Sequence, residues 1–208
     1  MAELIFHGAG CFEVKTKKVS AVVDPFPKEY GATVQLKDKV IILTDTKQSV
    51  DSSNTKFIIN GPGEYEVSNL SLKGIPVQKN IDDESMHEGV IYRIVVGEIV
   101  IGLLGNLFPK LSDEQLEELG IVDILIVPVG GNGLSPDAIG AASLVRDIEP
   151  KLVLLSHFES SKIKYPMPQN GTDIFAKEFG SEIMVQSKIK LDRSSLPEDI
   201  QVVELEEV

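Results

Sequence analysis

A run of apolar residues that stops at a polar turn constrains this chain most, and it lies at Val40 to Val50, VIILTDTKQSV. Four consecutive apolar residues open the stretch, which predicts a strand buried on both faces. The polar turn follows at the carboxyl end of the strand, where layered α/β proteins usually carry their chemistry. Its residues, Thr44 to Ser49, offer one carboxylate, three hydroxyls, one amide and one ammonium group. Because imidazole and thiolate donors are missing, the turn is a poor site for a transition metal.

The order of the predicted elements indicates two sheets that pack face to face with helices outside. Short strands fill the first half of the chain, and from Ser112 helical periods alternate with buried strands. A capping box at Ser112 to Gln115 starts one helix, and Ser135-Pro136 predicts the start of another. No fixed repeat or low-complexity linker divides the sequence, so we expect a single domain over residues 1–208 of mixed α/β (α+β) class. The predicted strands are Leu4 to Phe6, Cys11 to Val14, Val19 to Val23, Val40 to Leu43, Phe57 to Asn60, Val67 to Ile75, Val90 to Val96, Glu98 to Leu104, Val122 to Val129, Leu152 to Leu155, Ile183 to Val185, Ile189 to Leu191 and Val202 to Leu205, and the predicted helices run from the capping box to Gly120, from Ala138 to Ile148 and from Thr172 to Phe179.

Charge and composition exclude several classes of partner. The formal charge of −12 repels phosphate backbones and anionic lipids, so we expect no nucleic-acid partner and no membrane partner. No apolar run approaches the roughly 20 residues that span a bilayer, and the start MAELIF lacks the basic residues of a signal peptide, so we expect a cytoplasmic protein. The single cysteine, Cys11, excludes an internal disulfide and a CxxC metal cluster.

Seven short stretches along nearly the whole chain occur in an order that is typical of one protein family. They resemble the metallo-β-lactamase fold superfamily and, within it, are similar to small zinc-dependent hydrolases of the ascorbate-phosphate lactonase type. The resemblance implies a four-layer αββα sandwich, a metal-dependent hydrolase ancestry and assembly into a homo-oligomer. The stretches are Phe6 to Phe12 (FHGAGCF), Val22 to Phe26 (VVDPF), Gly61 to Val67 (GPGEYEV), Gly74 to Pro76, Ser112 to Gly120 (SDEQLEELG), Val127 to Gly133 (VPVGGNG) and Leu155 to Phe158.

The same resemblance places most of the family's metal ligands on residues that are unable to bind a metal. Aligned on Thr44, the family signature His-x-His-x-Asp-His falls on Asp45, Lys47, Ser49 and Val50, a later ligand falls on Lys79, the bridging aspartate falls on Asn106, and a further family histidine falls on Ala9. Only the last ligand, His157, and the strand-end Asp24 remain. A hydrolytic metal needs at least three protein ligands and an open position, and a lysine ammonium adds positive charge without a lone pair. We therefore predict no catalytic residue and no bound metal.

The remaining polar residues are predicted to form a vestigial pocket. The sharpest hypothesis concerns Lys79, whose ammonium group would replace the missing metal charge by pairing with Asp24, Asp45 or Glu64. Simpler interpretations stay open, in which His157 is a hydrogen-bonded structural residue, Asp24 accepts backbone N–H groups in a turn, and Glu64 belongs to a glycine-rich turn. The predicted pocket residues are Asp24, Asp45, Lys47, Glu64, Lys79, Asn106 and His157.

Two functions are compatible with this pattern. The first is a metal-free pseudoenzyme without a cofactor, which acts by binding a small molecule or by assembling with a paralogous subunit or with copies of itself. The second is a hydrolase of small phosphorylated or lactone substrates with a reduced metal site, in which one divalent ion lies on Asp24, Asp45, Glu64 and His157. Such oxygen-rich ligation favours manganese or magnesium over zinc.

Overall fold

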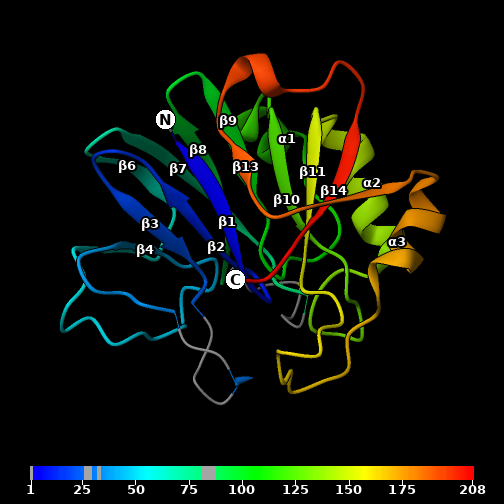
Figure 1. The fold of residues 1–208 in the computed structure, drawn as a ribbon, viewed down its shortest axis with the longest axis horizontal. Coiled ribbons are helices and arrows are strands. Elements are labelled where there is room, and N and C mark those ends of the chain that lie inside the picture. The colour runs from blue at the N-terminus through cyan, green and yellow to red at the C-terminus, as the bar shows by residue number, and fades with distance from the viewer. Residues whose placement is uncertain (1, 26–29, 32–33, 81–87) are drawn as a thin grey trace.

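The structure, a computed structural model, describes residues 2–25, 30–31, 34–80 and 88–208, and two β-sheets pack face to face in it (Figure 1). Phe26, the last residue of the VVDPF stretch, lies outside the described residues. The six-stranded sheet has the order β13 (Ile189–Lys190), β1 (Glu3–Gly8), β2 (Cys11–Lys15), β3 (Ser20–Val23), β4 (Val40–Ile42) and β5 (Phe57–Ile59). The eight-stranded sheet has the order β12 (Ile183–Gln186), β14 (Gln201–Leu205), β11 (Leu152–Ser156), β10 (Ile124–Pro128), β9 (Ile99–Leu103), β8 (Gly89–Val96), β7 (Leu70–Val77) and β6 (Gly63–Val67).

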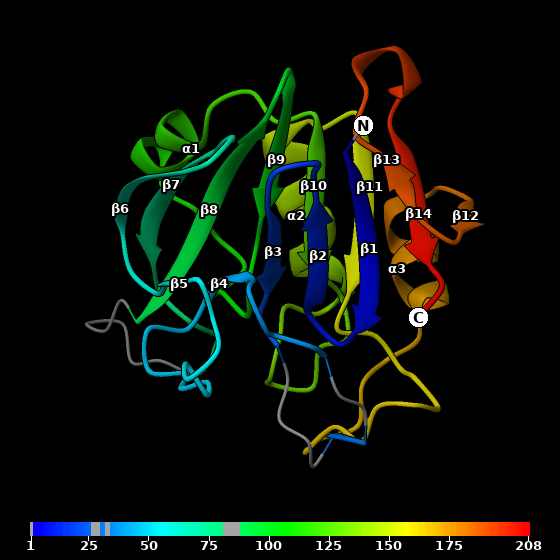
Figure 2. The same cartoon turned by 60° about the vertical axis from the view of Figure 1, so that its left-hand side comes forward.

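Three α-helices lie on the outer face of the eight-stranded sheet. They are α1 (Asp113–Leu119), α2 (Ala138–Ile148) and α3 (Thr172–Phe179), and a short 3-10 helix, η2, spans Arg193–Ser195. Figure 2 shows these helices on the far side of this sheet from β1, β2 and β3. Because sheet and helices cover both of their faces, β10 and β11 are buried at every residue, as their continuous apolar runs predict. Among the described residues, no helix has the length and hydropathy that a membrane crossing requires.

The outer face of the six-stranded sheet is covered by loops in the part of the chain that the structure describes. A small apolar cluster of Cys11, Val22, Ile41 and Leu43 packs there against loop residues such as Leu36. The mixed α/β class and the two facing sheets are thus confirmed, and the helices described here belong to the layer beside the eight-stranded sheet.

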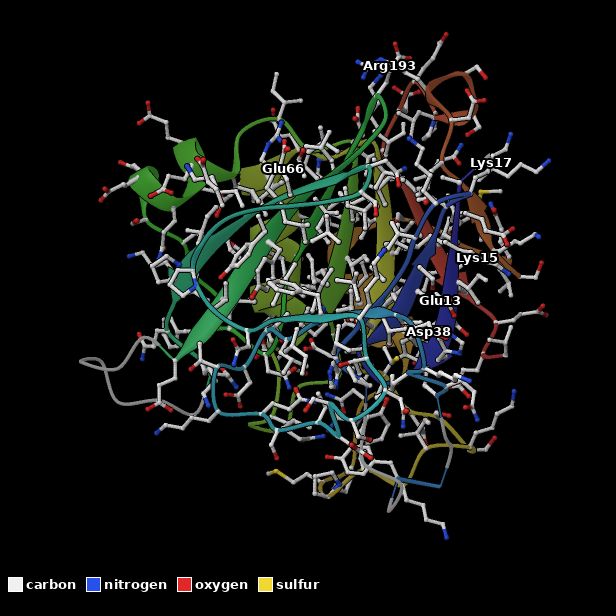
Figure 3. All side chains as sticks on the ribbon, turned by 90° about the vertical axis from the view of Figure 1, so that its left-hand side faces the viewer. Glu13, Lys15, Lys17, Asp38, Glu66 and Arg193 are labelled. Carbon is white, nitrogen blue, oxygen red and sulfur yellow. The ribbon has the colours of Figure 1, made fainter. Side chains whose placement is uncertain are left out.

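A buried carboxylate, which the sequence pattern did not reveal, completes this outer face. Glu13 on β2 is 7% exposed, and its side chain accepts hydrogen bonds from His7 (Nε2, 3.0 Å) and Ser20 and pairs with Lys39 (Nζ, 2.9 Å) (Figure 3, Glu13 labelled). These partners, His7 first, outweigh burial and hold the pKa of Glu13 at about 2. The face therefore contains an ionised and fully paired carboxylate.

One predicted strand and one predicted helix cap differ from the structure for local reasons. The stretch predicted as one strand from Val67 to Ile75 contains a turn, because Ser68 has a left-handed backbone (φ 61°) that ends β6 before β7 begins. The second helix spans Ala138–Ile148 as predicted, but its N-cap is Asp137 rather than Ser135, because the Asp137 carboxylate accepts the Gly140 N–H (2.8 Å). The Ser135 hydroxyl instead accepts the Gly131 N–H (3.0 Å) inside the preceding loop.

Tyr92 on β8 joins the two sheets near the end where the polar residues gather. Its ring is fully buried, and its hydroxyl donates to the carbonyl oxygens of Leu43 (3.0 Å) and Gly61 (3.3 Å). The ring fits because residue 74 is glycine: a Cβ atom on Gly74 would lie 2.9 Å from the Tyr92 ring and 2.7 Å from the Gly61 oxygen. A side chain of one sheet thus satisfies the carbonyl oxygen that follows a strand of the other.

Removal of this hydroxyl should destabilise the fold. In Tyr92→Phe, the Leu43 carbonyl oxygen stays buried without its donor, so we expect the free energy of unfolding in urea to fall by about 1–2 kcal/mol. Tyr65→Phe is the matched control, because the Tyr65 hydroxyl also donates to Gly61 (2.9 Å) but its side chain is only half-buried. Water can replace that bond, so the control should lose about 0.5 kcal/mol or less. Equal losses in the two variants would contradict the sheet-joining role of Tyr92.

Candidate functional site

A cavity of about 330 Å³ lies where strands of both sheets end. Asp24 follows β3, and Thr44 and Asp45 follow β4 in the six-stranded sheet, whereas Lys79 and His157 follow β7 and β11 in the eight-stranded sheet. Convergence of strand ends is the arrangement that the opening stretch predicted. The polar lining includes Asp24, Asp45, Lys47, Lys79, Asn106 and His157, and the remaining wall is formed mainly by Ala9, Tyr30, Val77, Val90, Leu107 and Leu134.

Glu64 is the one predicted pocket residue that does not line this cavity. It lies on β6, the edge strand of the eight-stranded sheet, opposite Lys73 of β7, and it is exposed to solvent. The turn interpretation of GPGE is also incomplete, because Gly63 and Glu64 already belong to β6. Of the partners suggested for Lys79, Glu64 is therefore excluded, and other carboxylates pair with the ammonium group.

Lys79 forms the central ion pair of the cavity. Its Nζ lies 3.1 Å from Asp45 Oδ2 and 3.6 Å from Glu88 Oε2, and its side chain is only 12% exposed. The backbone fixes both partners, because Lys79 bridges to Leu107 and Asp45 bridges to Gly89. The predicted pairing of Lys79 with Asp45 is confirmed, and Glu88 is a partner that the sequence analysis missed. Glu88 directly precedes β8 and lies opposite the turn after β4, a position that depends on strand pairing that the local sequence pattern does not reveal.

Lys47 adds a second, more exposed cation at the rim. Its ammonium group also pairs with Glu88, and its side chain is 68% exposed. The Lys47 backbone N–H donates to Asp45 Oδ1 (2.8 Å), which holds the Asp45 carboxylate in the turn. Asp45 and Glu88 therefore share two ammonium groups, one nearly buried and one in solvent.

Asp24 is held by Thr44 alone among the described residues. Its Oδ1 accepts the Thr44 backbone N–H (2.7 Å) and its Oδ2 accepts the Thr44 hydroxyl (2.6 Å). The carboxylate therefore accepts a backbone N–H as predicted, but from the end of the neighbouring strand rather than within its own turn. Burial raises the pKa of Asp24 to about 6; the Thr44 hydrogen bonds oppose this rise, and the Asp45 charge adds to it. No cationic side chain that the structure describes forms an ion pair with Asp24.

His157 is half-buried, and its imidazole is neutral. Its backbone has a left-handed conformation (φ 48°), and its N–H donates to the Ala9 carbonyl oxygen (2.8 Å). The ring lies against Gly10, where a Cβ atom would be 2.6 Å from Nε2, and Nδ1 is buried with no hydrogen-bond partner among the described residues. Burial lowers the pKa of His157 to about 4, so the ring is uncharged at neutral pH. The expected structural hydrogen bond is made by its backbone and not by Nδ1.

Asn106 closes the floor of the cavity through its backbone. Its carbonyl oxygen accepts the Asn80 N–H (2.8 Å), and its side-chain Oδ1 is buried without a partner in the described part of the chain. The preceding Gly105 lies against Thr44, because a Cβ atom there would be 2.3 Å from the Thr44 hydroxyl oxygen. The loop after β9 therefore packs closely against the turn after β4.

These donors do not fit the hydrolytic metal centre that the family resemblance implies. Across residues 2–25, 30–31, 34–80 and 88–208, no three His, Cys, Asp or Glu side chains form a group that could hold a metal ion. Of the ligand set Asp24, Asp45, Glu64 and His157, Glu64 lies outside the cavity and Asp45 already pairs with an ammonium group. A catalytic zinc needs three protein ligands, and a hydrolytic step through a metal has no support in this donor set.

Comparisons with known proteins agree with the fold. The family model described as the beta-lactamase superfamily domain matches residues 3–157. A UPF0173 protein of Pyrococcus abyssi is 22% identical over 180 residues, which cover 75% of this chain and 83% of that protein. Among solved structures, a candidate zinc-dependent hydrolase of the metallo-β-lactamase superfamily from Thermotoga maritima has a TM-score of 0.77 at 23% identity, covering 99% of this chain and 98% of that one. A metallo hydrolase from Ignicoccus hospitalis has a TM-score of 0.67 at 14% identity, covering 92% and 99%. At these identities the solved structures show the fold alone.

Loss of the Lys79 ammonium group should destabilise the cavity. In Lys79→Met, the aliphatic stem is largely kept but two partly buried carboxylates lose their shared cation, so we expect the free energy of unfolding to fall by about 1–3 kcal/mol. Lys47→Met removes the same charge from the same Glu88 at an exposed position and should lose about 0–1 kcal/mol. Urea unfolding of both variants checks the ranking, and a Lys79→Met variant as stable as Lys47→Met would contradict it.

The buried imidazole should make stability depend on pH with a defined sign. His157 titrates near 6.5 in the unfolded chain but has a pKa of about 4 in the fold, so the folded state loses stability as pH falls through this interval. His157→Asn removes this dependence, and asparagine tolerates the left-handed backbone. We expect the stability difference, wild type minus variant, to shrink as pH falls from about 7 to about 4 in urea titrations. A constant difference would show that the ring is not kept neutral by burial.

Proposed function

The chain belongs to the beta-lactamase superfamily domain family, and on this premise we propose that it is a pseudoenzyme, a hydrolase fold that binds a small molecule without a catalytic metal. The cavity that would hold the reaction centre contains a lysine cation in place of a metal donor set. According to this proposal, the protein keeps the binding cleft of its family but does not hydrolyse the molecule that it binds.

The ion pair of Lys79 with Asp45 and Glu88 is the observation that carries this proposal. A divalent ion about 4 Å from the ammonium group would be repelled by roughly 8 kcal/mol at an effective dielectric constant of about 20. It would also have to take Asp45 from its present partner. The charge repulsion and the loss of the Asp45 ion pair both oppose metal binding beside Lys79. A metal ion would meet both costs, because the bridge to Leu107 fixes the Lys79 backbone in place.

The other titratable groups of the described cavity do not supply a metal-free hydrolytic mechanism. Cys11 does not line the cavity, and burial raises the pKa of its thiol well above the usual range, so it carries no nucleophilic thiolate at neutral pH. The low pKa of His157 makes its imidazole a weak base. Thr44 carries a cavity hydroxyl that donates to a carboxylate, Asp24, but its backbone N–H binds the same carboxylate and its side chain is buried. This pair therefore holds the strand ends together rather than presenting a nucleophile to a ligand, which favours binding over turnover.

The cavity itself supports binding of a small molecule. Its volume of about 330 Å³ and its combination of an apolar wall with a polar floor are typical of small-ligand sites. Assembly with a paralogous subunit or with further copies of the chain, the other mode of action that the sequence left open, would leave this cavity without a role. Small-molecule binding is therefore the mode that we propose.

Metal analysis and an activity screen test this proposal directly. Protein purified without chelator should contain no stoichiometric zinc, manganese or iron by mass spectrometry, and it should not hydrolyse phosphodiesters or lactones in the presence of added Zn²⁺ or Mn²⁺. Lys79→Met is the informative control, because removal of the ammonium group frees Asp45 and Glu88 and should raise the affinity for Mn²⁺ above that of the wild type. One tightly bound ion per wild-type chain, together with chelator-sensitive turnover, would contradict the proposal.

A further inference from the structure

Among the residues that the structure describes, the charged groups around the cavity include more carboxylates than ammonium groups. Asp24 and Asp45 in the lining and Glu88 beside it face two ammonium groups, Lys47 and Lys79, so −3 + 2 leaves −1 among the described groups. The two lysines pair with Asp45 and Glu88, so the surplus charge is that of Asp24.

Asp24 is an unusual group to leave uncompensated. It lines the cavity, and among the described residues its oxygens accept only the two Thr44 hydrogen bonds and no cationic side chain pairs with it. A carboxylate can accept about four hydrogen bonds, so acceptor sites remain. A buried charge without a counter-ion is unfavourable, and a cationic ligand would relieve this cost.

The wall of the cavity suits the rest of such a ligand. Val77, Leu107 and Leu134 line it with aliphatic groups, and Tyr30 adds an aromatic side chain that also lines the cavity. An apolar body in contact with these residues would gain hydrophobic stabilisation, and an aromatic side chain is compatible with a neighbouring cation. An anionic ligand such as a phosphate ester would meet the surplus negative charge of the floor instead.

We propose that this cavity binds a small organic cation, an alkyl or aryl amine whose ammonium group pairs with Asp24 while its apolar body packs against Val77, Leu107 and Leu134. This inference rests on the proposed function, since it names the ligand class of the same metal-free cavity. It differs from the phosphorylated or lactone substrates that the family resemblance implies.

Calorimetric titration with three probes of matched shape tests the charge preference. Benzylamine, benzyl alcohol and benzoate carry a cation, a neutral polar group and an anion on the same ring, and hexylamine tests a flexible body. We expect saturable binding of the amines, at least about tenfold weaker binding of the alcohol, and no saturable binding of benzoate. Binding of benzoate or of the alcohol as tight as that of benzylamine overturns the inference, as does failure of both amines to bind.

Variants then locate the contact. Asp24→Asn keeps the side-chain shape and removes the charge, so benzylamine affinity should fall at least about tenfold. Glu64→Gln is the matched control, because it removes one negative charge from an exposed position outside the cavity and should leave the affinity unchanged. Leu134→Trp, at the half-buried wall, should block binding while Asp24 is intact, which keeps the test valid if Asp24→Asn folds poorly. Equal affinities for wild type and a folded Asp24→Asn variant would overturn the inference.

The outcome is separable from that of the metal analysis. Metal-free protein that prefers benzoate refutes only the organic-cation inference, whereas a stoichiometric metal with turnover refutes the proposed function irrespective of the amine titration.

Discussion

The cavity depends on one physical constraint: an ammonium group and a carboxylate from different sheets meet where strand ends converge. Asp45 follows β4 in the six-stranded sheet, and Lys79 follows β7 in the eight-stranded sheet, with 3.1 Å between their charged atoms. The family resemblance implies that a metal would link ligands at these positions. Here a covalently attached cation makes that link, so the charge is present whenever the chain is folded and needs no ion from solution.

The sequence pattern predicted much of this arrangement, but it failed for residues whose positions are set by the pairing of distant strands. Continuous apolar runs placed β10 and β11 correctly, and of the three carboxylates suggested as partners of Lys79, namely Asp24, Asp45 and Glu64, the structure shows the pair with Asp45. Motif position alone put Glu64 in the pocket, but on the edge strand β6 its side chain is exposed to solvent. Glu88 was missed because only the pairing of the turn after β4 with the start of β8 brings it to Lys79. Local periodicity reports burial, whereas the register between distant strands sets these contacts.

Two ionisable groups that line the cavity, Asp24 and His157, are partly buried at a cost in free energy that a purely structural core would not need. The pKa of Asp24 is raised and that of His157 is lowered, both by burial, so each group is less stable in its charged form than in water. Such local costs are expected at functional sites, where a sequence departs from what stability alone favours. They agree with the binding role that we propose for the cavity, whose described donors do not assemble a metal centre. The Tyr92 bridge shows how the surrounding sheets hold these groups in place.

Crystals grown with excess zinc chloride, with anomalous diffraction recorded at the zinc absorption edge, test the central claim most directly. We predict no anomalous peak inside the cavity and electron density for the Lys79 ammonium group within ion-pair distance of Asp45. A zinc peak bonded to His157 or Asp45, with Lys79 turned away from the cavity, would contradict the view that a lysine cation has taken the place of the metal.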